Sequence, residues 1–222
     1  MFMTESPRPR RRIPQDADPA SRDTPYGRRI SDPGALRALA HAGRYAILER
    51  LQTQGPATAT EVAAVAGLSP SACSYHLRLL ARHGFVEESP AGDGAVRDGR
   101  ERVWRAAIAG WWNDPEPGAD PREVQAVDST LSRVMLASSD AKVLDFVDRG
   151  ARERDWRDAA LFSNSTIAAT VEELDALGQA MMDLLRPLMM SNRPVSEAPE
   201  GARMVHLAIR MAPYPPESAP TT

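Results

Sequence analysis

The sequence of 222 residues is poor in cysteine, lysine and aromatic residues. Its one cysteine, Cys73, excludes an internal disulfide and a cysteine-rich zinc site, and fits the reducing cytoplasm in which we expect the protein. No run of about 18 apolar residues occurs, so we expect no transmembrane helix and no membrane partner. The basic stretch at residues 8–12 is not followed by an apolar segment, so we expect no secretory signal.

Motifs of enzymes are also missing. There is no Gly-rich phosphate loop, no nucleophile elbow and no His-Glu-x-x-His, so we predict that the protein is not an enzyme and has no catalytic residues and no cofactor. The four histidines, His41, His76, His83 and His206, are scattered along the chain. We therefore predict no metal site.

Charge is present but unevenly spread. The net charge is −3, yet residues 1–105 carry 16 basic and 12 acidic residues, whereas residues 106–222 carry 11 basic and 18 acidic residues. A basic half joined to an acidic half indicates that the first half meets a polyanion.

Composition divides the chain into five parts. Segments rich in Pro, Arg and Ser and nearly free of aliphatic residues cannot bury enough surface to fold, and clustered Pro and Gly mark a linker. We predict a disordered tail at 1–30, a first folded domain at 31–108, a linker at 109–121, a second folded domain at 122–212, and a disordered tail at 213–222.

The first domain has the element order of a winged helix. Apolar residues at helical spacing predict one helix over residues 32–55, and a second, capped by Thr60, ends at Gly67. A third helix follows Ser69, its N-cap, and runs from Pro70 to His83. Short strands at 85–88 and 101–106, joined by a turn-rich loop, predict a β-hairpin.

The third helix is suited to the major groove of duplex DNA. Its inward stripe is Cys73, Leu77 and Leu80, so Cys73 is interpreted as a small buried hydrophobe, with a redox switch as the alternative. Its outward face carries short polar side chains and arginine, which can reach base edges and phosphates. His76 lies between the two faces, as a structural hydrogen-bonder or a DNA contact. The predicted DNA-binding residues are Ser69, Ser71, Ser74, Tyr75, His76, Arg78, Arg97, Arg100 and Arg102.

Residues 68–86, LSPSACSYHLRLLARHGFV, resemble the recognition-helix segment of ArsR-type winged helix-turn-helix regulators. His41-Ala42-Gly43-Arg44 is similar to the family's His-Pro-x-Arg phrase, and residues 101–105 resemble the second wing strand of actinobacterial members. The resemblance covers about residues 32–107. It implies a homodimer that binds a palindromic operator, usually as a repressor released by a ligand. The paired cysteines and Asp/His sets of the family's metal sensors are missing here.

The second half has a different pattern. Apolar residues predict a long helix over about 122–152 with a seam that needs a partner helix. A strand at 161–169, a helix opened by the capping box at Thr170 and a strand at 203–211 follow, as a small β-α-β unit. Two interpretations stay open, dimerisation alone or dimerisation with a pocket for a small apolar ligand, which the methionines of this half would suit.

The sequence thus predicts a mainly α fold with small β (α+β), and a sequence-specific transcription regulator that binds double-stranded DNA. In this interpretation residues 31–108 are a winged helix-turn-helix DNA-binding domain, and residues 122–212 are a dimerisation and possible effector domain. The alternative is a winged-helix module that contacts another protein without reading DNA.

Overall fold

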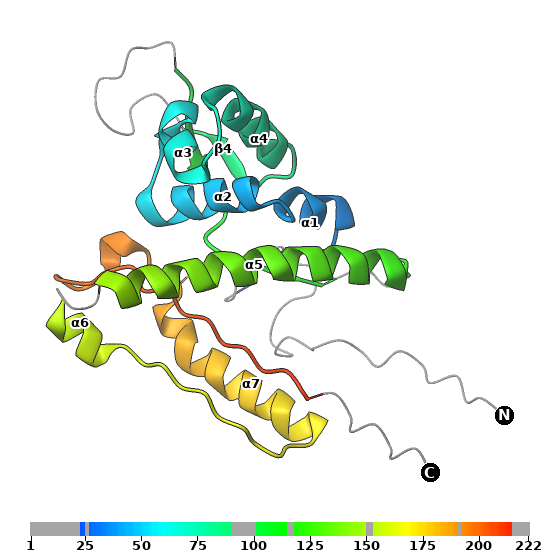
Figure 1. The fold of residues 1–222 in the computed structure, drawn as a ribbon. Coiled ribbons are helices and arrows are strands. Elements are labelled where there is room, and N and C mark those ends of the chain that lie inside the picture. The colour runs from blue at the N-terminus through cyan, green and yellow to red at the C-terminus, as the bar shows by residue number, and fades with distance from the viewer. Residues whose placement is uncertain are drawn as a thin grey trace.

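A computed structural model describes residues 23–24, 27–89, 101–114, 118–149, 153–190 and 192–214. Within them the chain is mainly helical with two small sheets, which confirms the predicted fold class. In Figure 1, helices α1 to α4 lie above the long helix α5, and α6 and α7 lie below it. The helices are α1 (Pro33–Leu39), α2 (Ala42–Gln54), α3 (Ala59–Ala66), α4 (Pro70–Arg82), α5 (Pro121–Arg149), α6 (Arg154–Ala159) and α7 (Val171–Leu185), with 3-10 turns η2 (Arg186–Leu188) and η3 (Val195–Glu197). The strands are β1 (Asp23–Thr24), β2 (Gly27–Ile30), β3 (Ala57–Thr58), β4 (Val86–Glu88), β5 (Val103–Ala106) and β6 (Trp111–Asn113).

The single helix predicted over 32–55 is in fact two helices, α1 and α2. The chain becomes extended at His41, whose Nδ1 accepts a hydrogen bond from the backbone N–H of Gly43 at 3.1 Å and so caps α2. The guanidinium of Arg44 donates to the carbonyls of Arg37 and Ala38 at the end of α1. The apolar residues keep helical spacing across the break, so their pattern predicts one continuous helix. That pattern contains no information on the hydrogen bonds that His41 and Arg44 make with the backbone.

Helices α3 and α4 form the helix-turn-helix. The cap of α3 is Thr58, not Thr60: its hydroxyl accepts from the N–H of Glu61, and the Glu61 carboxylate accepts from the N–H of Thr58. Gly67, in the left-handed conformation, ends α3 as predicted. The hydroxyl of Ser69 then accepts from the N–H of Ala72 at 3.2 Å and opens α4.

The wing is confirmed as an antiparallel pair of strands. Strand β5 lies between β4 and β3, with Glu87 opposite Arg105 and Ala57 opposite Trp104. Trp104 is 5% exposed and holds this sheet against the helices. The hairpin therefore stands beside α4, where a wing must be.

A second sheet corrects two predictions. Strand β2 pairs in parallel with β6, so Arg28 lies opposite Trp111. Residues 27–30 are thus not part of a disordered tail, and the predicted linker at 109–121 contains a strand. Both strands are too short to show a period of two, and their pairing joins residues about 80 positions apart, which no local pattern can report.

One hydrophobic core fills the first half and reaches into α5. Phe85, Leu39, Ile47 and Leu77 are fully buried in it, and α5 contributes Val127 and Leu131. Val124 is buried as well, but from Met135 onward the predicted seam is exposed. The exposed fractions are 39% for Met135, 62% for Leu144 and 56% for Val147.

The predicted β-α-β unit is wrong in its strands. Helix α7 begins with the predicted capping box at Thr170, but residues 161–169 and 203–211 are extended segments without any ladder. Gly178 is the one buried residue among those described from residue 153 onward. A strand needs a partner, and within the described chain neither segment has one.

Candidate nucleic-acid interface

Helix α4 is fixed to the core by one face. Cys73, Leu77 and Leu80 are each 0% exposed, which confirms the predicted inward stripe. Pro70 occupies the first turn, where its missing N–H costs nothing. The opposite face of the helix is therefore presented to solvent in a fixed orientation.

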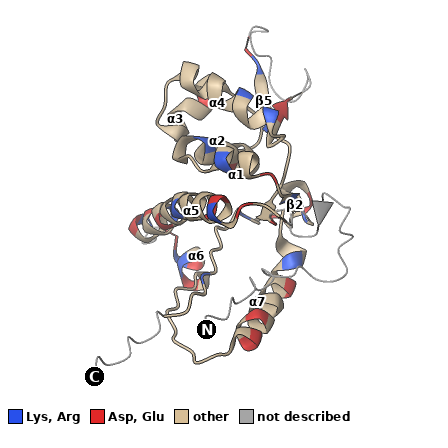
Figure 2. Cartoon of the chain, turned by 90° about the vertical axis from the view of Figure 1, so that its right-hand side faces the viewer, with Lys and Arg blue, Asp and Glu red and all other residues tan. Residues whose placement is uncertain are grey.

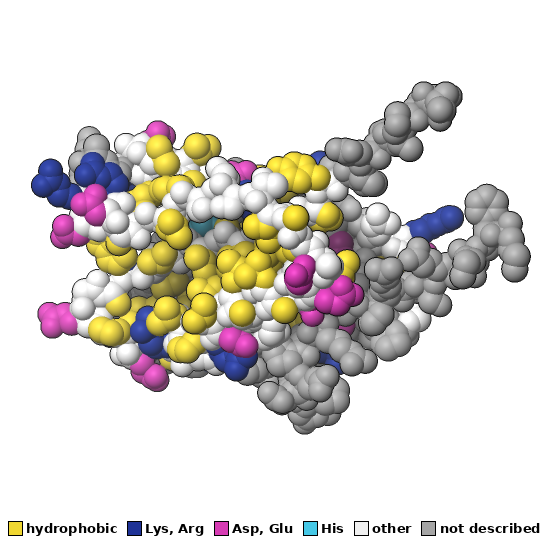
Figure 3. All heavy atoms as spheres, turned by 90° about the horizontal axis from the view of Figure 1, so that it is seen from below, with side chains coloured by type: hydrophobic (Ala, Val, Ile, Leu, Met, Phe, Trp, Pro, Cys, Tyr) yellow, Lys and Arg dark blue, Asp and Glu magenta, His cyan; other side chains and the backbone are white. Residues whose placement is uncertain are grey.

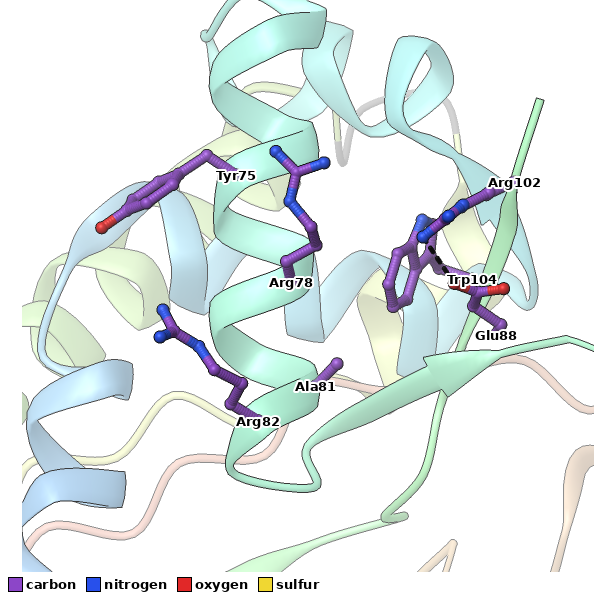
Figure 4. A pocket seen from close by; sticks show the side chains of 7 residues that line it. All are labelled: Tyr75, Arg78, Ala81, Arg82, Glu88, Arg102 and Trp104. Carbon is purple, nitrogen blue, oxygen red and sulfur yellow. Dashed lines mark hydrogen bonds and ion pairs between the residues drawn. The ribbon is translucent and has the colours of Figure 1, made fainter. Parts of the chain in front are cut away.

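Three long side chains project from successive turns of that free face. Tyr75, Arg78 and Arg82 are exposed and follow one another at helical spacing, as Figure 4 shows. Neither arginine forms a hydrogen bond or an ion pair with any residue that the structure describes. Both guanidinium groups can therefore donate hydrogen bonds to an external anion.

A shallow groove separates α4 from the wing. Arg102 lies on its far side, where its Nη1 donates to the Glu88 carboxylate at 2.9 Å, the contact dashed in Figure 4. Arg105 is paired with Glu87 at 2.8 Å in the same sheet. The groove is lined by Tyr75, Arg78, Ala81, Arg82, Glu88, Arg102 and Trp104.

The smaller predicted contacts lie at the start of α4. Ser69 and Ser71 are exposed and Ser74 is half-buried. Because the Ser69 oxygen accepts from Ala72, its O–H is still available to donate to a phosphate. These hydroxyls and the N–H of Ser71, which has no acceptor among the described residues, together suit a backbone phosphate.

His76 is turned away from this face. It is 9% exposed, and its ring lies 4.9 Å from that of His41, between centroids. Burial, then the proximity of His41 and Arg44, lower the pKa of His76, so the ring is neutral at pH 7. The burial of His76 thus argues against its predicted contact with DNA. At 100° per residue it falls just inside the buried stripe beside Leu77 and Leu80.

Two predicted residues, Arg97 and Arg100, lie outside the described residues. Arg82, by contrast, was not among the predicted contacts but lines the groove. The signal was available in the sequence, because Arg82 follows Arg78 by four positions and therefore shares its face.

Charge separates the interface from the second half. Figure 2 shows Lys and Arg on β5 and acidic residues along α7, where Glu172, Glu173, Asp175 and Asp183 are exposed. A polyanion is therefore attracted to the α4 and wing side.

Other site types find no support in the described ranges. Within them, no three His, Cys, Asp or Glu side chains are grouped so as to hold a metal ion. None of the helices described there has the length and apolarity needed to cross a bilayer.

Comparison with protein families finds a match in the first half of the chain. A model described as a helix-turn-helix domain matches residues 39–89, from the end of α1 to just beyond β4. No curated protein matches the chain. The match includes the whole of α4, so the chain contains a helix-turn-helix domain of the kind found in DNA-binding transcription regulators rather than enzymes.

Proposed function

We propose that this protein is a homodimeric transcription regulator of the ArsR type that binds a palindromic operator through α4 and the wing. The observation that carries the proposal is the pair of exposed guanidinium groups of Arg78 and Arg82, which have no partner among the described residues and face the groove beside β5. Side chains of this kind on the second helix of a helix-turn-helix are placed to reach bases and phosphates.

The roles within the interface follow from reach and chemistry. Arg78, in the middle of the exposed face, is assigned to a base edge, with Tyr75 beside it. Ser69, Ser71 and Ser74, at the helix start, are assigned to phosphates. Arg82 and Arg102 flank the groove and are assigned to the backbone on either side. Arg102 would exchange Glu88 for a phosphate or share its guanidinium between the two.

A homodimer is supported by the open seam of α5. Met135, Leu144 and Val147 are exposed along the part of the helix that extends beyond the core. One recognition helix covers one half-site, so two copies related by a twofold axis match a palindrome. We expect the protein to repress transcription, and the expression of a reporter gene placed behind the operator measures this effect.

The test is binding of the full chain to DNA from its own upstream region, followed by fluorescence anisotropy at several salt concentrations. We expect specific binding whose affinity falls steeply with salt, because phosphate contacts release counterions. Absence of binding, or binding indifferent to salt, would refute the proposal and favour a winged-helix module that contacts another protein.

A further inference from the structure

The C-terminal part of the protein presents a broad apolar face. Seen from below, the surface formed by the elements beneath α5 is dominated by hydrophobic side chains (Figure 3). The exposed fractions are high for residues that normally form a core: 86% for Leu161, 60% for Phe162, 59% for Ile167, 78% for Leu184 and 65% for Val205. Exposed apolar surface on this scale marks an interaction site.

Within this face, one side of residues 204–211 is held to α5. At the start of the segment, Arg203 pairs with the Glu153 carboxylate and lies over the Trp156 ring, 5.1 Å from its centroid. The Nη2 of Arg210 donates to the hydroxyl of Ser139 on α5 at 2.7 Å and pairs with the Asp140 carboxylate at 2.7 Å. His206 Nε2 lies 2.9 Å from the same Ser139 oxygen. His206 and Arg210 are four residues apart, so in an extended chain they point to the same side.

From Val205 to Ile209 the other side of the segment is apolar and open. Val205, Leu207 and Ile209 alternate with the anchoring residues, and their exposed fractions are 65%, 58% and 39%. The backbone of residues 203–211 makes no backbone hydrogen bond within the described chain, and neither does that of residues 161–169. An anchored, extended segment with a free hydrogen-bonding edge is a strand that lacks its neighbour.

We propose that the missing neighbour is the same segment of a second copy, paired antiparallel about a twofold axis at Leu207. This inference rests on the homodimer in the proposed function and names its interface. A twofold axis forces two identical strands to run antiparallel, and it places Leu207 opposite its own mate and Val205 opposite Ile209.

The pattern of the segment fits this pairing better than a strand of an unrelated protein. Its apolar residues are symmetric about Leu207, so both copies present them on one face. Its basic residues each meet an uncharged partner: Arg203 faces Met211, Arg210 faces Met204, and His206 faces Ala208. Like charges directly opposite would be destabilising, and this register has none.

The interface would also be connected to the DNA-binding half. Ser139 and Asp140, which anchor the strand, lie on α5 beside Ser138 and Lys142, and both of these contact Glu49 of α2. A second copy paired with residues 203–211 is therefore linked, through α5, to α2 of the helix-turn-helix domain.

The first experiment measures the mass of the full chain in solution by light scattering. We expect a dimer for the parent protein and a monomer for Leu207→Asp at the same concentration. The matched control is Val195→Asp, since Val195 is equally exposed, at 56%, but lies outside the segment. The control should stay dimeric. A monomeric parent, or a dimeric Leu207→Asp variant, would overturn the proposal.

The second experiment tests the register and does not depend on weakening the dimer. In a Cys73→Ala background, Leu207→Cys places two thiols opposite each other, with Cα atoms about 4.5–5.5 Å apart, a spacing a disulfide accepts. Mild oxidation should give a covalent dimer, whereas Val195→Cys should not. A dimer in solution that never crosslinks through position 207 would refute this pairing.

DNA binding by the same variants separates this inference from the proposed function. Specific binding by a protein that fails both tests would leave the regulator intact and the strand pairing refuted. Conversely, a crosslinked dimer that never binds its upstream DNA would leave the pairing intact and refute the regulator.

Discussion

Lys142 Nζ lies 2.9 Å from the Glu49 carboxylate, and this contact ties the long helix α5 to α2 of the helix-turn-helix domain. Ser138 donates to the same carboxylate at 2.7 Å. Lys142 is the only lysine of the chain. Glu49 accepts both hydrogen bonds, and its side chain is only 21% exposed.

Lys142→Met should lower the free energy of unfolding by about 1 kcal/mol, since it leaves a mostly buried carboxylate with fewer donors. Urea unfolding at a fixed protein concentration measures the loss. The control is Arg149→Met, which removes the exposed ion pair with Asp145 at the far end of α5 and should change nothing measurable. Equal losses in the two variants would show that the Glu49 contact has no special weight.

Gly84→Ala should destabilise the fold more than Gly67→Ala does. Both glycines have positive φ, +71° and +64°, so each alanine costs roughly 1–2 kcal/mol of backbone strain. At Gly84 the new Cβ would also lie 2.7 Å from Arg28 Nη1, which donates to the Gly84 carbonyl, whereas at Gly67 nothing lies within 4 Å. Thermal unfolding compares them. Identical losses would mean that Arg28 moves aside freely.

Stability should fall as the pH is lowered from neutral through the range of histidine titration. Burial, His41 and Arg44 lower the pKa of His76, so the unfolded chain binds a proton more readily than the folded one. The contribution is complete above the ordinary histidine pKa of about 6.5 and is lost as the pH falls through the lower folded value. Urea midpoints at several pH values measure this loss.

The pH dependence also has an internal control. His76→Gln should make the dependence shallower but not abolish it, because the pKa values of His41 and His206 are lowered as well, each mainly by burial. An unchanged slope in His76→Gln would rule out His76 as a contributor.

Arg78→Ala should weaken operator binding by about 1–3 kcal/mol without loss of stability, because the side chain is exposed and unpaired within the described structure. Its control, Arg122→Ala, removes an exposed charge from the start of α5 and should leave affinity nearly unchanged. Anisotropy with operator and with unrelated DNA separates the two assignments of Arg78. A loss of equal size on both DNAs would make Arg78 a phosphate contact rather than a base contact.

Local rules were enough to predict the helix that would read DNA. Ser69, Pro70 and the stripe of Cys73, Leu77 and Leu80 lie within one stretch of the chain, and capping and periodicity act over a few residues. The hairpin was predictable for the same reason. The burial of His76 could not be predicted in this way, because its position next to Leu77 lies on the boundary between the buried and the exposed face. Its contact with the ring of His41, from another helix, shows that it belongs to the buried face.

Local sequence patterns predicted helices α3, α4, α5 and α7, the start of α4, and the chemistry of its exposed face. The break of the first helix at His41, the pairing of β2 with β6, and the lack of a strand partner for 203–211 among the described residues became visible only in the folded chain. The last two of these features depend on residues that are distant along the chain. Strand pairing and burial depend on residues far apart in sequence, while capping and helical spacing depend on neighbours.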